Sequence, residues 1–315
     1  MYLIRLTRPL NLFIVAATML AIRYGITVPN LSKANLQSAL PTFDFVLIIF
    51  STILLGASGY IINDYFDQKI DRINRPNETI IGTKVHRRMA ILLHWILNIL
   101  GLLLGSLLAF RLKLYWIIGV YFVVTVLFWF YSTYFKRIWY KGNILVSLLA
   151  GMVPFQVVLF EFAWLIKEKN LEISDLYQNS QTFKIFLLVV IYSAFAFITN
   201  FIREILKDFK DIKGDARFGR KTLPLIWRPK KAKWFVQILT SLLILTLILL
   251  YLLIKDRYQW TLGVYLIFFI IAPLVATLIY TYKARETNKY AIPERLMKIV
   301  MVTGIIACYI FGPNL

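Results

Sequence analysis

Two clusters of acidic residues share one spacing, D-x-x-D-x-x-x-D, although they lie far apart along the chain. At about 100° per residue, the three aspartates of such a cluster fall within about 60° of one another on an α-helix. Each cluster therefore predicts a stripe of carboxylates along one face of a helix. With the asparagine that precedes the first cluster, the residues concerned are Asn63, Asp64, Asp67 and Asp71, and then Asp208, Asp211 and Asp215.

Three carboxylates on one helix face repel one another unless a positive charge lies between them. Oxygen ligands without a Cys or His partner favour Mg²⁺, or Mn²⁺, over zinc. Mg²⁺ commonly combines one or two carboxylates with waters and substrate phosphates. Two facing clusters would therefore hold a diphosphate through bridging ions that neutralise the leaving group as a C–O bond breaks. Solvated charged loops are the simpler alternative, but the repeated spacing beside two apolar segments favours a functional pair.

The elements that must position these clusters are long apolar segments. Hydrophobic residues make up 59% of the chain and charged residues only 17%. A membrane-spanning helix needs roughly 17–25 mostly apolar residues, whereas a barrel strand needs about 10. We therefore expect an all-α polytopic membrane protein whose transmembrane helices form a bundle around a central cavity. Nine segments qualify, near 9–28, 43–62, 89–110, 114–134, 142–165, 183–202, 234–254, 260–281 and 296–312.

No low-complexity linker or soluble domain interrupts the apolar segments. We therefore expect a single transmembrane domain over residues 1–315. The acidic motifs at 63–71 and 208–215 each follow closely on the end of a span, which suggests a pseudo-repeat of two helical halves.

The basic residues are concentrated in alternate gaps between the spans. Most of the 36 Lys and Arg residues lie at the N-terminus or near the gaps 63–88, 135–141, 203–233 and 282–295. The positive-inside rule places these stretches, and both acidic clusters, on the cytoplasmic side of the cell membrane. In a soluble protein the net charge of +20 would suggest nucleic acid. Here it reflects topology and anionic headgroups, so we expect no nucleic-acid partner.

At these residues the chain resembles the UbiA superfamily of intramembrane prenyltransferases. The first cluster matches the family pattern N-D-x-x-D-x-x-x-D in the second helix, and the second matches D-x-x-D-x-x-x-D after the sixth helix. The run 203–215 looks most like the branch that makes digeranylgeranylglyceryl phosphate. Shorter matches are 219–224 after the second cluster, Tyr131-Ser132 with Lys136, and Arg8-Pro9 with Asn11.

One stretch departs from the family pattern. Many members continue the first motif as R-P-x-R-P-I-P-S-G, whereas this chain has Arg75-Pro76 and then Glu78-Thr79 where the second Arg-Pro would stand. The resemblance places this loop near the acceptor entrance, so the departure bears on the identity of the acceptor.

The resemblance implies a transferase that moves a prenyl group from a prenyl diphosphate to a lipophilic acceptor in the bilayer. Asn63 and the six aspartates are the expected metal ligands. Residues expected to act in catalysis are Asn63, Asp67, Asp71, Asp208, Asp211 and Tyr131, where Tyr131 or an aspartate not fully committed to metal would accept a proton from an alcohol acceptor. Residues expected to bind substrate, mainly by cationic stabilisation, are Arg8, Asn11, Arg72, Lys136, Arg137, Lys141, Arg203 and Lys207.

Three functions remain open from the sequence. The preferred acceptor is geranylgeranylglyceryl phosphate, and the first alternative is an aromatic acceptor, a benzoate or naphthoate of quinone biosynthesis. A cation transporter with acidic gates is a remote alternative. Transporters place ionisable groups near mid-membrane on broken helices, whereas the acidic residues here lie at span ends.

Overall fold

The computed structural model describes residues 2–36, 40–138, 140–254 and 260–314. Throughout these ranges the regular structure is helical, and the one exception is an isolated β-bridge between Ile81 and Val85. The all-α prediction is therefore confirmed. The chain forms two compact units, Met1–Phe135 with Val153–Val190 and Lys136–Met152 with Ile191–Leu315. That both halves act as a single domain stays a prediction.

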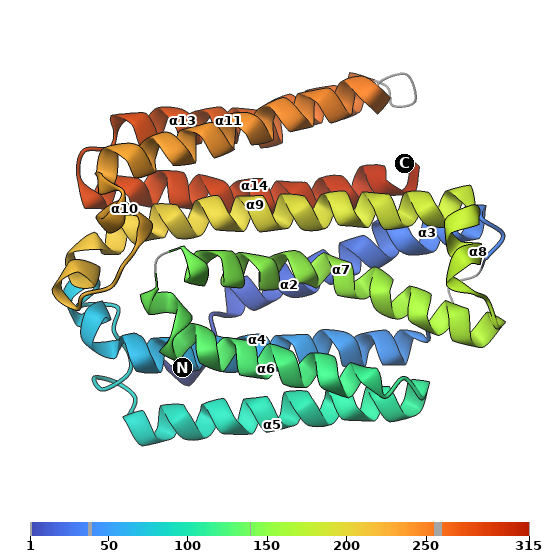
Figure 1. Cartoon of the computed structure of the whole chain (residues 1–315), viewed down its shortest axis with the longest axis horizontal. Helices are drawn as coiled ribbons and strands as arrows, with labels where there is room; N and C mark the ends of the chain where they lie inside the picture. The colour runs from blue at the N-terminus through green and yellow to red at the C-terminus, as the bar shows by residue number, and fades with distance from the viewer. Residues whose placement is uncertain (1, 37–39, 139, 255–259, 315) are drawn as a thin grey trace. The chain divides into compact units, whose positions relative to one another are not determined.

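The first unit is built around α4 (Thr42–Asn74), which packs against α5 (Arg87–Leu112) and α6 (Trp116–Thr133). Figure 1 shows these three helices side by side. The remaining elements of this unit are α1 (Tyr2–Leu6), α2 (Pro9–Ala21), the π-helix η1 (Ile22–Thr27), α3 (Val28–Lys33), α8 (Ile173–Gln178), the later part of α7 (Lys141–Lys169) and the start of α9 (Ser180–Arg217).

α4 and α5 approach closely because a glycine faces the contact. The hydroxyl of Ser51 donates a hydrogen bond to the carbonyl of Gly101 at 2.7 Å, which fixes the two backbones. A Cβ on Gly101 would lie 2.8 Å from the side chain of Leu55, too close for an undisturbed packing. From this contact α4 continues as one helix to the first acidic cluster near its C-terminal end.

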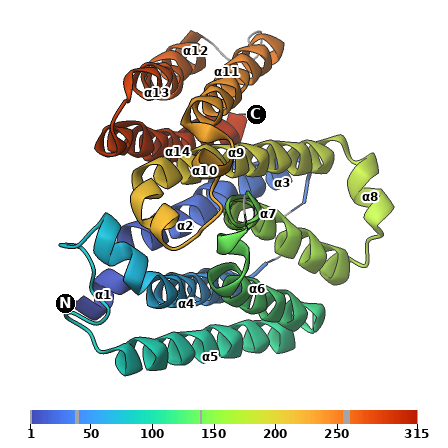
Figure 2. The same ribbon diagram turned by 60° about the vertical axis from the view of Figure 1, so that its left-hand side comes forward.

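The second unit packs the later part of α9 against helices from the end of the chain. Its core joins Leu206 and Phe209 of α9 to residues of α11 (Arg228–Ile254), α13 (Ala272–Lys283) and α14 (Ala291–Phe311). Phe209 stacks on Tyr290 with ring centroids 4.5 Å apart. In both Figure 1 and Figure 2, α11 and α13 run beside each other. Short elements complete the unit: α10 (Leu223–Ile226), α12 (Trp260–Tyr265), the π-helix η3 (Leu266–Ile271) and the 3₁₀ turns η2 (Phe135–Arg137, whose first residue belongs to the first unit), η4 (Thr287–Tyr290) and η5 (Gly312–Asn314).

Across the described ranges, eight helical segments are long and apolar enough to cross a membrane, and the expected count of nine is not confirmed. The ninth expected span corresponds to α14, which is helical but carries Glu294, Arg295 and Lys298 in its first part. Large apolar side chains on the spans are widely exposed, as lipid contact requires. The protein is therefore an integral membrane protein. The eight segments are Pro9–Lys33, Thr42–Asn74, Arg87–Leu112, Trp116–Thr133, Lys141–Lys169, Ser180–Arg217, Arg228–Leu253 and Trp260–Lys283.

Both acidic clusters lie on helices, as their spacing predicts. α4 continues as one helix to Asn74 and so includes the whole first cluster. α9 continues to Arg217 and includes the whole second cluster. In each case the polar cluster forms the C-terminal end of a helix whose earlier part is apolar.

Substitution of the packed glycine will destabilise the first unit. We expect Gly101→Ala to lower the free energy of unfolding by about 1–3 kcal/mol, because the new Cβ forces Leu55 out of place. The matched control is Gly119→Ala on α6, where an added Cβ meets nothing within 4 Å and alanine favours the helix. Thermal unfolding of the detergent-solubilised variants checks this. Equal midpoints for both variants would contradict close packing at Gly101.

Candidate active site

The first acidic cluster lies partly inside its own unit. Asn63 and Asp67, one turn apart on α4, are 6% and 4% exposed, so their polar atoms face protein. Asp64 and Asp71 are half-buried. The predicted stripe therefore exists, and it is turned inward at the end of an otherwise apolar helix.

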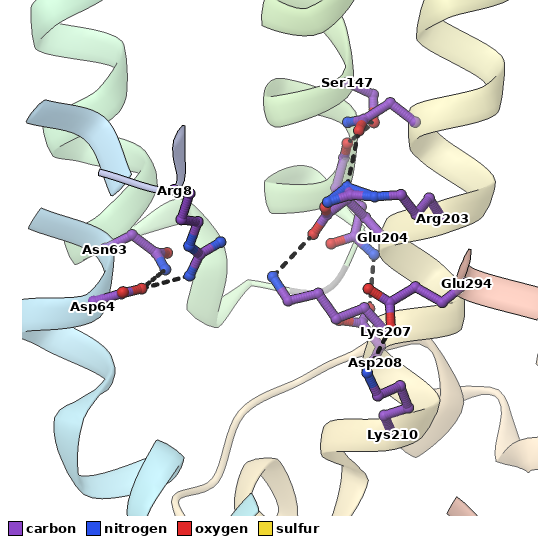
Figure 3. Close-up of polar contacts among 12 residues, drawn as sticks. Arg8, Asn63, Asp64, Ser147, Arg203, Glu204, Lys207, Asp208, Lys210 and Glu294 are labelled. Carbon is purple, nitrogen blue, oxygen red and sulfur yellow. Dashed lines mark hydrogen bonds and ion pairs between the residues drawn. The ribbon is translucent and has the colours of Figure 1, made fainter. Parts of the chain in front are cut away.

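Asp64 already binds a positive charge from the N-terminal segment. Nη2 of Arg8 lies 2.5 Å from Oδ1 of Asp64. Nδ2 of Asn63 donates to the same oxygen at 3.3 Å. Figure 3 shows Arg8 and Asn63 both directed at the Asp64 carboxylate. Two residues predicted separately, Arg8 from its motif and Asp64 from its cluster, are thus brought together.

The loop that departs from the family pattern folds back onto the end of α4. Nε2 of Gln68 donates to the carbonyl of Ile81 at 2.9 Å, and Nη2 of Arg72 reaches the carbonyl of Gly82 at 3.5 Å. Gly82 has φ 79°, and a Cβ there would lie 1.7 Å from the Gln68 amide, so the turn requires glycine. Arg72, expected to bind substrate, is therefore engaged in holding this loop.

A small polar cavity lies beside the first cluster. It has a volume of about 210 Å³. Both Asp64 and Asp71 of the cluster line it, as does Glu78, which stands where many UbiA members have arginine. The cavity also has three basic side chains, from Arg5, Arg8 and Arg75. A pocket with both charges is suited to a polar or ionic group.

The second cluster has a different set of partners. Nδ2 of Asn143, at the start of α7, donates to Oδ2 of Asp208 at 2.7 Å. Asp215 is 2% exposed and lies 3.4 Å from Nη1 of Arg220. Each of these aspartates is therefore oriented by a neutral or cationic donor, as a metal ligand would have to be.

Two glutamates hold the basic residues around the second cluster. Glu204 accepts from Nη1 of Arg203 at 2.8 Å and from Nζ of Lys207 at 3.4 Å. Glu294 on α14 accepts from Nζ of Lys210 at 2.5 Å. Figure 3 shows Glu204 on the same helix as Asp208, with Lys207 reaching back to it. Arg203 and Lys207, both expected to bind substrate, are thus fixed near Asp208.

The pKa of Glu294 lies below its ordinary value. Burial, the largest single influence, raises the pKa, but the hydrogen bond from Lys210 and the charges of Lys210, Arg203 and Lys207 together outweigh it. Glu294 is therefore ionised at neutral pH and acts as a fixed negative charge beside the basic residues.

The remaining expected residues are placed as follows. Tyr131 is buried on α6, Asn11 lies in the first turn of α2, and Lys141 is exposed at the start of α7. Lys136 is half-buried in η2, and the side chain of Arg137 lies outside the described part of the chain.

Sequence reasoning missed Glu204, Glu294 and Asn143. Glu204 has a signal in the sequence, because it precedes Asp208 by four residues and so extends the same helix face. Asn143 contacts Asp208, 65 positions away, and Glu294 contacts Lys210, 84 positions away. No local sequence pattern predicts either contact.

The carboxylate and amide oxygens of the first cluster suit Mg²⁺, although the described residues do not form a complete set of metal ligands by themselves. Among the described residues, no three His, Cys, Asp or Glu side chains converge as a metal site would need. Mg²⁺ does not require this, since one or two carboxylates with waters and phosphates suffice. The guanidinium of Arg8 at Asp64 demonstrates that a cation fits against this carboxylate. Carboxylate and amide oxygens on one helix face are therefore compatible with the ion.

A family model decides the assignment. Residues 31–302 match the model described as UbiA prenyltransferase family. The chain belongs to the UbiA prenyltransferase family. It is therefore a prenyltransferase, and the family predicted from the two aspartate motifs is confirmed.

Similar proteins agree with this assignment. A digeranylgeranylglyceryl phosphate synthase from Methanosphaera stadtmanae is 30% identical over 85% of this chain and 87% of its own length. Another from Methanosarcina mazei is 32% identical over 70% of this chain and 68% of its own length. A UbiA homologue from Aeropyrum pernix shares the fold at 15% identity and a TM-score of 0.63, covering 92% of this chain and 97% of that chain. A UbiA homologue from Archaeoglobus fulgidus, bound to DMAPP and Mg²⁺, shares it at 17% identity and a TM-score of 0.53, covering 98% and 100%.

Loss of the Glu294 carboxylate will destabilise the second unit. We expect Glu294→Gln to lower the free energy of unfolding by about 1–3 kcal/mol at neutral pH, because Lys210 keeps its charge without its partner. The matched control is Glu286→Gln, which breaks the exposed Glu286–Lys289 pair of 3.6 Å and should change little. Thermal unfolding in detergent measures both.

The Glu294 effect has a defined pH dependence. Because folding lowers the pKa of Glu294, the ionised carboxylate contributes its full share of stability above the unfolded-state pKa of about 4.3. That stability disappears as the pH falls through the pKa of the folded state. The difference between wild type and Glu294→Gln should therefore shrink in acid. A difference that grows as pH falls would contradict the ion pair with Lys210.

Proposed function

We propose that this prenyltransferase transfers a prenyl group from a prenyl diphosphate to geranylgeranylglyceryl phosphate, with Mg²⁺ ions held by the two acidic clusters. The two D-x-x-D-x-x-x-D stripes on the ends of α4 and α9 carry the proposal, because they supply oxygen ligands on two similar helix ends. Relatives named digeranylgeranylglyceryl phosphate synthase, 30% identical over 85% of the chain, support the acceptor.

The bound ions would be held by Asn63 and the six aspartates, Asp64, Asp67, Asp71, Asp208, Asp211 and Asp215. When bound, Mg²⁺ supplies positive charge that neutralises the departing diphosphate. Asn143 orients the carboxylate of Asp208 through its 2.7 Å hydrogen bond. Arg203 and Lys207, held by Glu204, add positive charge for phosphate oxygens. Asn11, Lys136, Arg137 and Lys141 remain proposed substrate contacts.

The chain's apolar helices protect the reacting carbon from water. Prenyl transfer leaves positive charge on the allylic carbon, and water there would give an alcohol instead of the product. The acceptor hydroxyl attacks this carbon and loses its proton to an aspartate not fully committed to metal or to Tyr131, which is buried on α6.

The proposed orientation puts the N-terminus and both acidic helix ends on the cytoplasmic side. Lys and Arg are concentrated near those ends, as the positive-inside rule requires. The proposal also treats residues 1–315 as a single functional domain, with each half contributing one cluster.

Removal of one carboxylate from either cluster will abolish transfer. We expect Asp67→Ala and Asp211→Ala each to lower the rate by about 10²-fold or more, and EDTA to do the same to wild type, because each change weakens the metal site. The assay follows labelled prenyl diphosphate in membranes containing equal amounts of protein. Glu286→Ala, which removes an exposed carboxylate outside both clusters, is the control. Full activity in both aspartate variants would refute the proposal.

A panel of acceptors will identify the branch. Purified protein with Mg²⁺ and labelled geranylgeranyl diphosphate should form a product with geranylgeranylglyceryl phosphate and none with hydroxybenzoate or dihydroxynaphthoate. The relatives named digeranylgeranylglyceryl phosphate synthase support this acceptor, and the arginines lining the cavity beside the first cluster would bind its phosphate. A product with an aromatic acceptor alone would replace the proposed acceptor while leaving the prenyltransferase chemistry in place.

A further inference from the structure

The position of Arg8 is built into the backbone. Arg8 has φ 52° and ψ 64°, a left-handed conformation that a non-glycine residue adopts only when its surroundings impose it. Its N–H bonds the carbonyl of Arg5 at 3.2 Å, and its carbonyl accepts from the N–H of Asn11 at 2.9 Å. Pro9 then begins α2. The tight turn between α1 and α2 therefore fixes where the Arg8 side chain starts.

Apolar packing holds this turn against α4. Leu6, the last residue of α1, is 1% exposed and packs with Ile61 of α4 and with Ile81 and Val85 of the following loop. The turn is thus attached both to the helix that carries the first cluster and to the loop beside it. The N-terminal segment cannot move away from Asp64 without exposing Leu6.

The guanidinium of Arg8 makes two contacts on one face of α4. It lies 2.5 Å from Oδ1 of Asp64 and 5.0 Å from the ring centroid of Tyr60. Tyr60 and Asp64 are four residues apart and so share a helix face. The side chains of Arg8 and Asp64 are only 28% and 20% exposed, so water screens the pair incompletely. Stacking and charge together make this a specific contact.

We propose that Arg8 is a tethered counter-ion of the first acidic cluster, which a divalent cation must displace from Asp64 before it can bind there. The inference rests on the proposed function, in which this cluster binds Mg²⁺. Arg8 and a metal ion compete for the same carboxylate, and Oδ1 of Asp64 already accepts from both Arg8 and Asn63. The pair offsets one of the three carboxylate charges at this helix end and so reduces their mutual repulsion.

Displacement gives Arg8 a second use. A guanidinium matches carboxylate and phosphate oxygens with the same planar pair of donors. Once released from Asp64, Arg8 remains tethered beside the cluster and can bind a phosphate oxygen of the incoming substrate. Metal alone therefore binds more weakly, because it must break the Arg8–Asp64 pair. When a diphosphate is also present, Arg8 gains a new partner and this loss is offset.

Metal binding without any prenyl diphosphate tests the inference. The probe is Mn²⁺, and its affinity for the full chain in detergent is measured by electron paramagnetic resonance. We expect Arg8→Met to raise the affinity about threefold to tenfold, because the competing cation is gone. Arg5→Met is the matched control: Arg5 lines the same cavity and carries the same charge, so its loss should change the affinity less than about twofold. An unchanged or weaker affinity in Arg8→Met would overturn the inference.

Two further variants guard against a misfolded N-terminal turn. Tyr60→Leu removes the stacking partner without changing charge, and should raise Mn²⁺ affinity in the same direction by a smaller factor. With Asp64→Asn in the background, Arg8→Met should have no effect on affinity, because the contested carboxylate is absent. An Arg8→Met effect of the same size in that background would show that Arg8 acts through general charge, and would sink the inference.

The outcomes separate this inference from the proposed function. If wild type binds Mn²⁺ and Asp67→Asn abolishes binding, the cluster is a metal site and the proposed function stands. If Arg8→Met then leaves Mn²⁺ affinity unchanged, only the counter-ion role of Arg8 is overturned. If Asp67→Asn leaves Mn²⁺ binding intact, the metal role of the first cluster fails, and the inference fails with it.

Discussion

Repulsion among neighbouring carboxylates is the constraint on which the rest of this structure depends. Each acidic stripe places three like charges on one helix face, which is unfavourable unless cations are brought to it. In the first unit the cation comes from the N-terminal turn, where Arg8 contacts Asp64. In the second unit Arg220 contacts Asp215, and Asn143 donates to Asp208. The carboxylates of each stripe are therefore stabilised by different partners, which come from different parts of the chain.

The membrane explains why these stripes lie where they do. A helix in lipid satisfies its own backbone and cannot present a row of ionised groups to the hydrocarbon. α4 and α9 resolve this by continuing as single helices beyond their apolar parts, with the carboxylates at the C-terminal end. Extra glutamates in the second unit then hold basic residues nearby, Glu204 on the same helix and Glu294 from α14. Local charge balance is thus part of the fold as well as of the site.

Much of this was predictable because it depends on local periodicity. The D-x-x-D-x-x-x-D spacing predicted two helical stripes, and α4 and α9 contain them whole. Lengths of apolar sequence predicted the spans. Of the nine expected spans, α14 alone is not apolar enough to count as one that crosses a membrane, because Glu294, Arg295 and Lys298 interrupt it. The pairings of Arg8 with Asp64 and Asn143 with Asp208 join residues 56 and 65 positions apart. Such contacts arise from tertiary packing, so spacing alone could not predict them.

The loop after the first cluster departs from the family pattern, and the departure changes its charge. Glu78 takes the place of an arginine and lines the cavity with Asp64 and Asp71, opposite Arg5, Arg8 and Arg75. With an arginine there, the cavity would carry an excess of positive charge; with Glu78, acidic and basic residues balance. An anionic headgroup entering this cavity would compete with Asp64 for the guanidinium of Arg8. Its binding is therefore linked to any metal ion that takes the place of Arg8 at Asp64.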